Sequence, residues 1–306
     1  MPRPSNRKLV VAPLPPASTM PSLFDIHPPP WPPAKNIWLE SWNGMLSRRR
    51  LRRRYRSVQM HIQRLPEGPE RLGAGVIFCA TQSEPDDCAI AHYILRKHFQ
   101  LDPYFLLDHR QIDAQPALSR LGALGIHYDH RAATVTTLHF AAELLRGTDL
   151  PGTLPFEAAH PRGLWTQPVD DERSRKAGVL RCRTAIARLV RFASGLKDDT
   201  GRDTTAPPAS IGHHRMSARL RRAQMVPLII PVALHRLHTP AATDGSEGLA
   251  REDLYIDFGE PWEISDFNIG IQAWTHLLEE HLNRHHAEST HLIQTDPGRD
   301  YQRILT

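Results

Sequence analysis

The residues best suited to chemistry lie in a short polar run, ATQSEPDD, which follows the apolar residues GAGVIFC. The run offers two hydroxyls, Thr81 and Ser83, and a carboxylate, Asp86, directly after a predicted buried strand. A carboxylate about one turn from a histidine can orient that histidine as a general base. The run contains no histidine, and threonine has no pKa near neutrality, so Thr81 cannot act as the base.

Other candidate proton acceptors lie near the next predicted strand and its edge. They are Asp108, His109, His127 and His130. These side chains could approach the same strand ends and supply a base there, although ordinary surface histidines are the simpler interpretation. His92 follows Asp86 by six residues on a predicted helix, and we expect it to face away from Asp86.

The 18 histidines raise the question of a metal site. Partial ligand spacing occurs at 127–130 and 276–286, but a zinc site needs three or four converging ligands. The acidic residues 170–172 are interpreted as a solvated turn. The sequence therefore predicts neither a metal nor a cofactor. Three cysteines without a CxxC pair favour a reducing compartment.

Alternating strands and helices must position these side chains. Short apolar segments predict strands, and apolar residues three and four positions apart predict helices. The predicted strands are 72–80, 103–107, 125–129, 163–168, 226–234 and 254–262, and the main helices are 86–99, 132–147, 178–195 and 266–285. This interleaving predicts an α/β fold with a central, mostly parallel sheet flanked by helices.

Two segments of different character precede this α/β domain, which we place at residues 64–290, with a C-terminal tail at 291–306. Prolines make residues 1–35 an extended arm. Residues 36–63 read as an amphipathic helix, in which Trp38 and Trp42 precede seven arginines between Arg48 and Arg56. Such a segment suits an anionic membrane surface. A helix packed on the body with a solvated basic end is equally compatible, and nucleic acid is a poorer partner because no reading module accompanies the run.

Charge and hydropathy support the same division of the chain. The net charge is +5, and residues 1–70 carry 12 Lys/Arg against 4 Asp/Glu, so the remainder is net acidic. No run of 18 apolar residues predicts a transmembrane helix, and the basic, proline-broken start does not resemble a signal peptide. The expected location is cytoplasmic, peripheral to the membrane.

The order of these segments resembles the glycerolipid (lysophosphatidate-type) acyltransferases over about residues 70–265. Their first motif is Asn-His, four residues and Asp after a buried strand. Here Ala80 and Thr81 stand in the Asn-His places, Ser83 is a common neighbour, and Asp86 matches the aspartate. The segments VPLIIPVAL and FGEP resemble the fourth block and a later strand end.

The second and third blocks are matched in part. In LGALGIHYD, Gly122 fits a Gly-Ala-Phe-like turn, whereas Tyr128 stands where arginine is expected. In the third block, Pro168 and Arg173 match. The non-matching positions are Gln167, Val169, Asp170 and Ala185.

The resemblance implies an acyl transfer in which a histidine acts as base, an aspartate orients it, and the second and third blocks hold the acceptor's phosphate. Thr81 and Asp86 then occupy the catalytic positions. The implied substrate-binding positions are Ser83, Gly122, Tyr128, Pro168 and Arg173.

Because the base is replaced, the expected function is that of a catalytically impaired acyltransferase-family protein. It would bind lipid or an acyl chain at the membrane surface, or partner an active paralogue. The alternative is an active O-acyltransferase with an atypical base. That enzyme would move an acyl group from acyl-CoA or acyl-ACP to a lysolipid or glycolipid hydroxyl.

Overall fold

The computed structural model describes residues 35, 37–64, 75–81, 84, 87–146, 161–194, 227–238, 252–262, 269–295 and 301–305. The predicted arm lies outside these residues except for Lys35, and so do the candidate site residues Ser83 and Asp86. None of the described helices is both long and apolar enough to cross a membrane.

A single eight-stranded sheet runs through the molecule in the order β4-β3-β5-β2-β6-β7-β1-β8. In chain order its strands are β1 (Tyr55–Ile62), β2 (Val76–Ala80), β3 (Asp102–Asp108), β4 (Ala123–Ile126), β5 (Arg162–Thr166), β6 (Leu228–His238), β7 (Glu252–Phe258) and β8 (Gln302–Leu305). Only the β6–β7 and β1–β8 pairs are antiparallel. The predicted α/β class with a mostly parallel sheet is confirmed.

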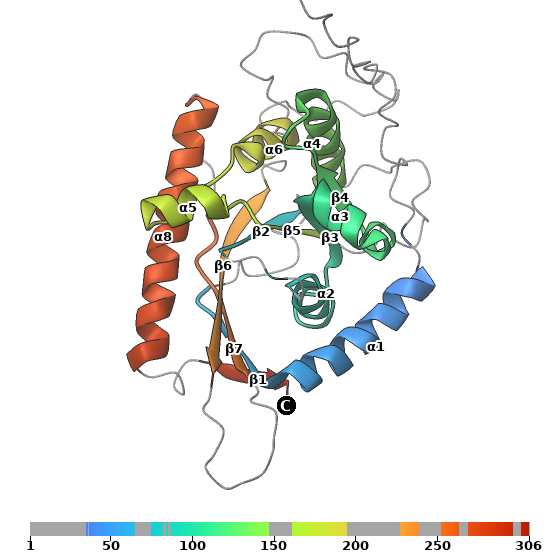
Figure 1. Cartoon of the computed structure of the whole chain (residues 1–306), viewed down its shortest axis with the longest axis vertical. Coiled ribbons are helices and arrows are strands. Elements are labelled where there is room, and N and C mark those ends of the chain that lie inside the picture. The colour runs from blue at the N-terminus through green and yellow to red at the C-terminus, as the bar shows by residue number, and fades with distance from the viewer. Residues whose placement is uncertain are drawn as a thin grey trace, which may run out of the picture.

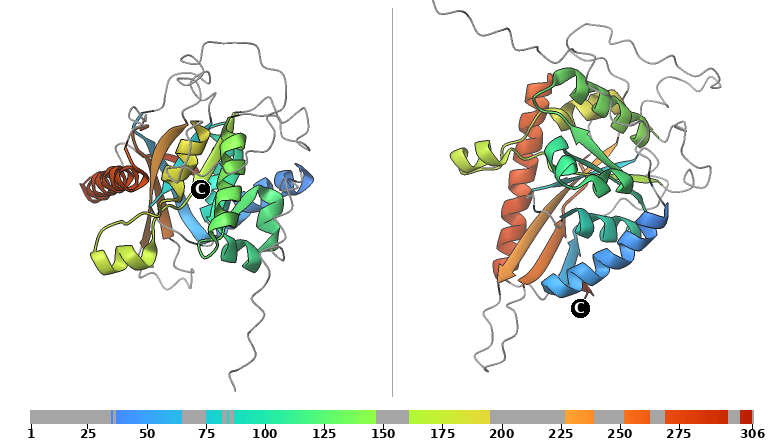
Figure 2. Two further views of the ribbon diagram at one scale, coloured as in Figure 1. Left: turned by 90° about the horizontal axis from the view of Figure 1, so that it is seen from above. Right: turned by 45° about the vertical axis from the view of Figure 1, so that its right-hand side comes forward.

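Helices cover both faces of this sheet (Figures 1 and 2). One face carries α1 (Ile37–Arg54) and α2 (Asp87–Lys97), and the other carries α4 (Arg131–Leu145), α6 (Ala185–Ala193) and α8 (Ile271–Thr295). The shorter elements are α3 (His109–Ala114), the 3-10 helix η2 (Pro116–Leu121) and α5 (Asp171–Ala177).

Strand β2 shows how the sequence produces two cores. Its five residues are all buried, and successive side chains point to opposite faces. Ile77 and Cys79 join the core beneath α4, α6 and α8, whereas Phe78 and Ala80 join the core beneath α1 and α2. A strand covered on both faces must be apolar throughout, which explains the uninterrupted run VIFCA.

The predicted helix over 36–63 is wrong in its second half. The helix ends at Arg54, and residues 55–62 form β1, which pairs with β7 and β8. Burial of Val58 and Met60, two positions apart, is the strand periodicity that the preceding arginine run obscured. The predicted tail at 291–306 likewise contributes the end of α8 and strand β8.

Two predicted boundaries also shift. The strand predicted at 125–129 is β4, which begins at Ala123 after Gly122 closes the 3-10 helix in the left-handed conformation (φ 92°). Tyr128 therefore lies in the turn beyond the strand. The helix predicted at 178–195 is confined to α6, and Gly178 instead ends the short helix α5.

Candidate functional site

The carboxyl ends of the parallel strands meet at one edge of the sheet, which is where ligands bind in open α/β sheets. In register, Thr166 of β5 lies beside Cys79 of β2 and Leu106 of β3, and Asp108 of β3 lies beside Ile126 of β4. The residues that follow these strands therefore line the same edge. Of the predicted site residues, Thr81, Tyr128 and Pro168 follow β2, β4 and β5 there.

Gly122 is not part of this edge. It precedes β4, so it lies at the amino end of a strand whose carboxyl end faces the site. A Cβ atom at this position would stand 3.2 Å from the Pro103 carbonyl oxygen and 3.1 Å from the Tyr104 ring. It turns the chain into β4, and it lies at the opposite end of that strand from the other candidate site residues.

Thr81 closes β2 as a structural residue. Its amide donates to the Val232 carbonyl at 2.9 Å, which extends the β2–β6 pairing by one residue. The side chain is buried, and its hydroxyl has no hydrogen-bond partner among the described residues. A buried hydroxyl without a histidine or carboxylate partner has no route to activation.

Among the described residues after β2, Asp87 provides a buried carboxylate; the predicted Asp86 lies outside the described residues. Asp87 is fully buried, and its Oδ1 forms an ion pair with Nη2 of Arg236 on β6. Its Oδ2 accepts from the Glu84 amide at 2.8 Å and from the Gln167 side-chain amide at 3.2 Å. Burial raises the pKa of Asp87 from 3.8 to about 6, against the opposing effect of the Arg236 charge. Both oxygens are occupied, so this carboxylate fixes the chain after β2.

Arg236 links that segment to the far half of the sheet. Its Nε lies 3.2 Å from Oε2 of Glu84 and 3.3 Å from the Tyr55 hydroxyl. Arg54, at the end of α1, donates to the same Glu84 oxygen at 2.7 Å. Sequence reasoning missed Arg236 because its partners are remote in the chain. The available signal was that Arg236 lies two residues after the buried Leu234 on β6, and so on the same face of the strand. An arginine on a buried face almost always has a partner.

A second polar centre lies at the ends of β3 and β4. Nδ1 of His109 is 3.2 Å from Oδ1 of Asp108 and 3.3 Å from the Ile126 carbonyl oxygen. Both neighbours are acceptors, so these contacts favour the tautomer with the proton on Nδ1 and the lone pair on Nε2. Gly125 permits this approach, since a Cβ there would stand 3.3 Å from Cβ of His109. The Asp108–His109 pair thus has the arrangement of an oriented general base.

His127 packs against this pair. Its ring stacks on that of His109 with 4.2 Å between centroids. Burial first, and the neighbouring His109 second, lower the pKa of His127 below its ordinary value. His130 is not free for a similar role, because its Nδ1 accepts from the Ala133 amide at 3.1 Å and caps α4. His92 is buried on α2, on the opposite face of the sheet from α4.

Tyr128 stands at the expected arginine position, and the guanidinium of Arg183 stacks on its ring. The Arg183 guanidinium carbon lies 3.8 Å from the ring centroid, a cation–π contact. Arg183 also approaches Asp170 at 3.5 Å and Asp108 at 3.8 Å. Burial raises the pKa of Tyr128, so its hydroxyl remains protonated. A cation is therefore present here, but it comes from the segment before α6.

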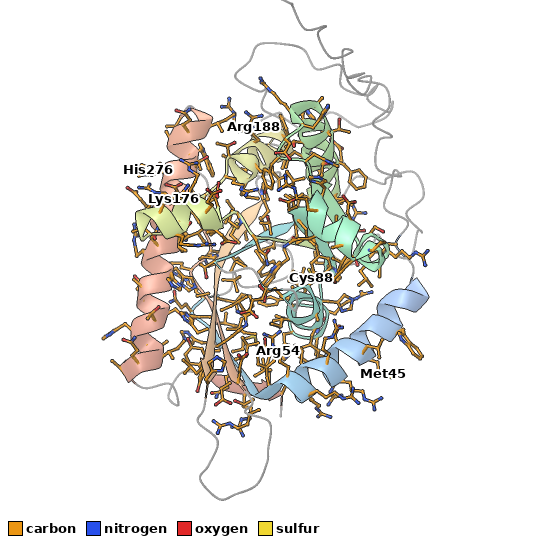
Figure 3. All side chains as sticks on the ribbon, in the orientation of Figure 1. Met45, Arg54, Cys88, Lys176, Arg188 and His276 are labelled. Carbon is orange, nitrogen blue, oxygen red and sulfur yellow. The ribbon has the colours of Figure 1, made fainter. Side chains whose placement is uncertain are left out.

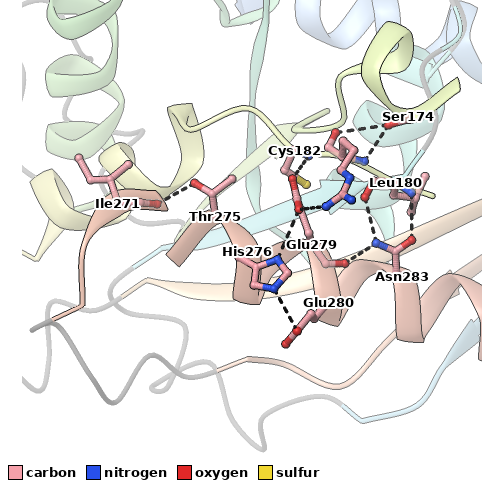
Figure 4. Close-up of polar contacts among 10 residues, drawn as sticks. Ser174, Leu180, Cys182, Ile271, Thr275, His276, Glu279, Glu280 and Asn283 are labelled. Atoms are coloured by element: carbon pink, nitrogen blue, oxygen red, sulfur yellow. Dashed lines mark hydrogen bonds and ion pairs between the residues drawn. The ribbon is translucent and has the colours of Figure 1, made fainter. Parts of the chain in front are cut away.

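Helix α8 holds that segment in place, as Figure 4 shows. Oε1 of Glu279 accepts from the Cys182 amide at 2.7 Å, and its Oε2 contacts Arg181 at 3.1 Å. Asn283 pairs with both backbone groups of Leu180, at 2.9 and 3.0 Å. These contacts fix the chain immediately before Arg183.

A cavity of about 420 Å³ opens above the second centre. Its lining includes Asp108, His109, Tyr128, Arg173 and Arg183. The predicted Arg173 thus reaches the site from α5, although its amide is occupied by Asp170, the N-cap of that helix. Pro168 contributes its backbone carbonyl, which accepts from the Arg183 amide at 2.8 Å.

The cysteines do not add a nucleophile to either centre. Burial raises the pKa of Cys88, beside Asp87, to about 12 and that of Cys182 to about 12. The thiolate is the reactive form of cysteine, so these thiols are inert at neutral pH. Within the described residues, no three His, Cys, Asp or Glu side chains converge as metal ligands.

Neither a known family model nor a curated protein sequence matches this chain.

Proposed function

We propose that this chain is a glycerolipid acyltransferase-like protein with an impaired catalytic centre, which binds lipid or an acyl chain at a membrane surface. The observation that carries the proposal is that both carboxylate oxygens of Asp87, beside the end of β2, are already engaged by other residues. Acyl transfer to a hydroxyl needs a base within hydrogen-bonding reach of that hydroxyl. Thr81 has no basic group, and Asp87 is buried with both oxygens engaged by Arg236, Glu84 and Gln167.

The fold is compatible with the resemblance that prompted this proposal. The strand that precedes Thr81 is central, and the segments that resemble the second and third blocks follow neighbouring strands at the same edge. The acyltransferase-like fold remains part of the proposal, as does pairing with an active paralogue.

Helix α1 provides the membrane contact in this proposal. One side of the helix is exposed, with Trp42 at 58% and Met45 at 60%. We define the α1 surface as Trp42, Met45, Leu46, Arg49 and Arg53. Figure 3 shows Met45 on the outer side of the helix. Indole at headgroup depth beside arginines suits anionic lipid. Of the predicted run Arg48–Arg56, Arg54 and Arg56 are instead paired with Glu84 and Asp253.

Vesicle flotation tests the membrane contact. The full chain should float with vesicles containing phosphatidylserine and not with pure phosphatidylcholine. The variant Trp42→Ser/Met45→Ser should lose this flotation, whereas Leu277→Ser, which removes an exposed leucine (41%) from α8, should retain it. Equal flotation of both variants would contradict the proposal. Deleting residues 1–63 is unsuitable as a test because it removes strand β1.

A second candidate function is an active O-acyltransferase that uses His109 as its base. It is favoured by one observation, the Asp108–His109 pair with Nε2 available beside the 420 Å³ cavity. In this function His109 takes the proton of a lysolipid or glycolipid hydroxyl as that oxygen attacks the thioester carbonyl of acyl-CoA or acyl-ACP. The thiol then leaves and takes up a proton.

Incubation with labelled acyl-CoA or acyl-ACP and a panel of lysolipids and glycolipids separates the two functions. An impaired protein gives no turnover, and Thr81→His should then introduce measurable transfer. If the wild type turns over, His109→Gln should reduce the rate by about 10²-fold or more, while His276→Gln on exposed α8 should not. Turnover that survives His109→Gln would exclude the second candidate.

A further inference from the structure

A cavity of about 780 Å³ opens between α1 and α2, which lie side by side in Figures 1 and 2. It is lined by residues of both helices, by His98 directly after α2 and by Ile304 of β8. We call it the α1–α2 cavity. It lies on the opposite face of the sheet from α4 and α6, and no residue of the candidate site at the strand ends lines it. It is therefore a separate place for a ligand.

The inner part of the α1–α2 cavity is partly apolar. Tyr93 and Ile304 are half-buried and pack against the core beneath α1 and α2. His92 is buried next to Gly44 of α1, where an added Cβ would stand 3.8 Å from its Cε1. The Tyr93 ring meets the His98 ring edge to face, with 5.7 Å between centroids. These side chains form a wall against which an apolar chain can pack.

The outer part of the cavity is lined by three exposed cations, Arg48 of α1 and Arg96 and Lys97 of α2. No described Asp or Glu lines the cavity, and neither Arg48 nor Lys97 forms an ion pair of 4.0 Å or less with one elsewhere. Arg96 and Lys97 also offset the dipole in the last turn of α2, whereas Arg48 lies well before the end of α1. Positive charges from two helices thus meet at one cavity, which favours a negatively charged ligand.

We propose that the α1–α2 cavity binds a fatty-acid carboxylate, with Arg48, Arg96 and Lys97 around the carboxylate and the chain along Tyr93 and Ile304. This inference rests on the proposed function, because it names the acyl ligand and gives it a site. Guanidinium groups pair with both oxygens of a carboxylate. The volume lies within the range of about 300–1,000 Å³ in which proteins bind small organic molecules.

Calorimetric titration of the full chain with fatty acids, below their critical micelle concentrations, tests both parts of the cavity. Octanoate should bind saturably. Acetate has the charge without the chain, and octanol has the chain without the charge, so both should bind at least about tenfold more weakly. From octanoate to dodecanoate the affinity should rise about two- to fourfold per added CH₂ group, because the chain is buried progressively. Equal binding of octanol and octanoate would overturn the proposal.

Two substitutions at the cavity assign the binding to this site. Arg48→Gln and Lys97→Gln should each weaken dodecanoate binding by about tenfold, since each removes a charge-assisted hydrogen bond. Both residues are exposed, and circular dichroism verifies that the variants fold. The matched control is Arg49→Gln, the exposed neighbour of Arg48 that does not line the cavity, which should bind as the wild type does. Equal weakening in Arg49→Gln would assign the effect to the overall charge of α1 and overturn the proposal.

Vesicle flotation separates a failure of this site from a failure of the membrane contact. Trp42→Ser removes an exposed indole that does not line the cavity, so it should weaken flotation and bind dodecanoate as the wild type does. Lys97→Gln, on α2 and outside the α1 surface, should show the reverse. A wild type that floats but does not bind dodecanoate would overturn the cavity proposal alone. A wild type that binds dodecanoate but does not float would contradict the membrane contact alone.

Discussion

Asp87 and Arg236 are separated by 149 residues in the chain and form a buried ion pair at the end of β2. Such a pair contributes little net stability compared with an apolar pair of equal volume, but removing one partner leaves an uncompensated buried charge. Here the pair also fixes Glu84 and Gln167, which belong to two different loops of the candidate site. The geometry of that edge therefore depends on single polar contacts.

We expect Asp87→Ala to destabilise the fold by about 3–5 kcal/mol, because Arg236 loses its closest counter-charge while remaining 7% exposed. Urea unfolding measures the change. The control is Glu172→Ala, which removes the exposed Glu172–Lys176 pair and should cost less than about 1 kcal/mol. Equal effects of the two substitutions would show that the buried pair does not hold this edge.

Between elements, α8 packs closely against β6 and the end of β7. A Cβ atom on Gly259, which follows β7, would stand 2.6 Å from Nδ1 of His285 and 2.8 Å from Cγ of Pro231. His285 cannot move aside cheaply, because it is buried and its Nε2 contacts the Asp257 carbonyl at 3.1 Å. Only glycine lets the helix approach this strand end.

Gly259→Ala should therefore destabilise the protein by about 1–3 kcal/mol through overpacking. The comparison is Gly270→Ala, where an added Cβ has no neighbour within 4 Å. Thermal unfolding followed by circular dichroism should show a lower Tm for the first variant only. An equal decrease of Tm in both variants would show that the loss of stability comes from the backbone and not from the contact with α8.

The same helix contact should be sensitive to acid. Burial lowers the pKa of His235 from 6.5 to about 4, where its Nε2 lies 3.0 Å from the Ser289 hydroxyl and its ring stacks on His286. A lowered pKa means that the unfolded chain binds the proton more readily, so stability falls as the pH drops from about 6.5 toward 4. The raised pKa of Asp87 offsets part of this loss over 4 to 6, whereas the lowered pKa values of His281 and His286 add to it.

We expect unfolding free energies measured in urea to be about 1–2 kcal/mol lower at pH 5 than at pH 7 on account of His235. His235→Gln retains a partner for Ser289 but cannot titrate, so it should lose that part of the difference. An unchanged pH dependence in this variant would assign the acid sensitivity to other groups.

At the scale of the whole molecule, β1 joins the N-terminal region to the end of the chain. It pairs with β7 on one side and with β8 on the other, and it buries Tyr55, Val58 and Met60. The segment before residue 64 and the segment after residue 300 are therefore parts of one sheet. Unfolding should be cooperative across the whole described body.

Fluorescence and circular dichroism should consequently report coincident urea transitions in the wild type. Removing residues 1–63 should abolish that cooperative transition, because β8 loses the strand it pairs with and β7 keeps only β6. A variant without residues 1–63 that still unfolds in one sharp transition would show that β1 is dispensable.

The sequence by itself determined the features that depend on neighbouring residues. Apolar runs such as VIFCA and the helical spacing of Ile186, Leu189 and Val190 established the α/β alternation, because burial of a strand or a helix face leaves a local period of two or 3.6. The lack of a base at Thr81 is what the resemblance to the acyltransferases implies, and it stays a prediction.

Only the tertiary structure decided which charges meet. It paired Asp87 with Arg236 and brought Arg183 onto Tyr128. An ion pair between remote segments produces no repeating pattern in the sequence. The partner of a buried charge can be a single side chain on any element of the fold. The strand β1 was hidden for a related reason: its short alternation follows seven arginines, and its partners β7 and β8 lie about 200 or more residues away.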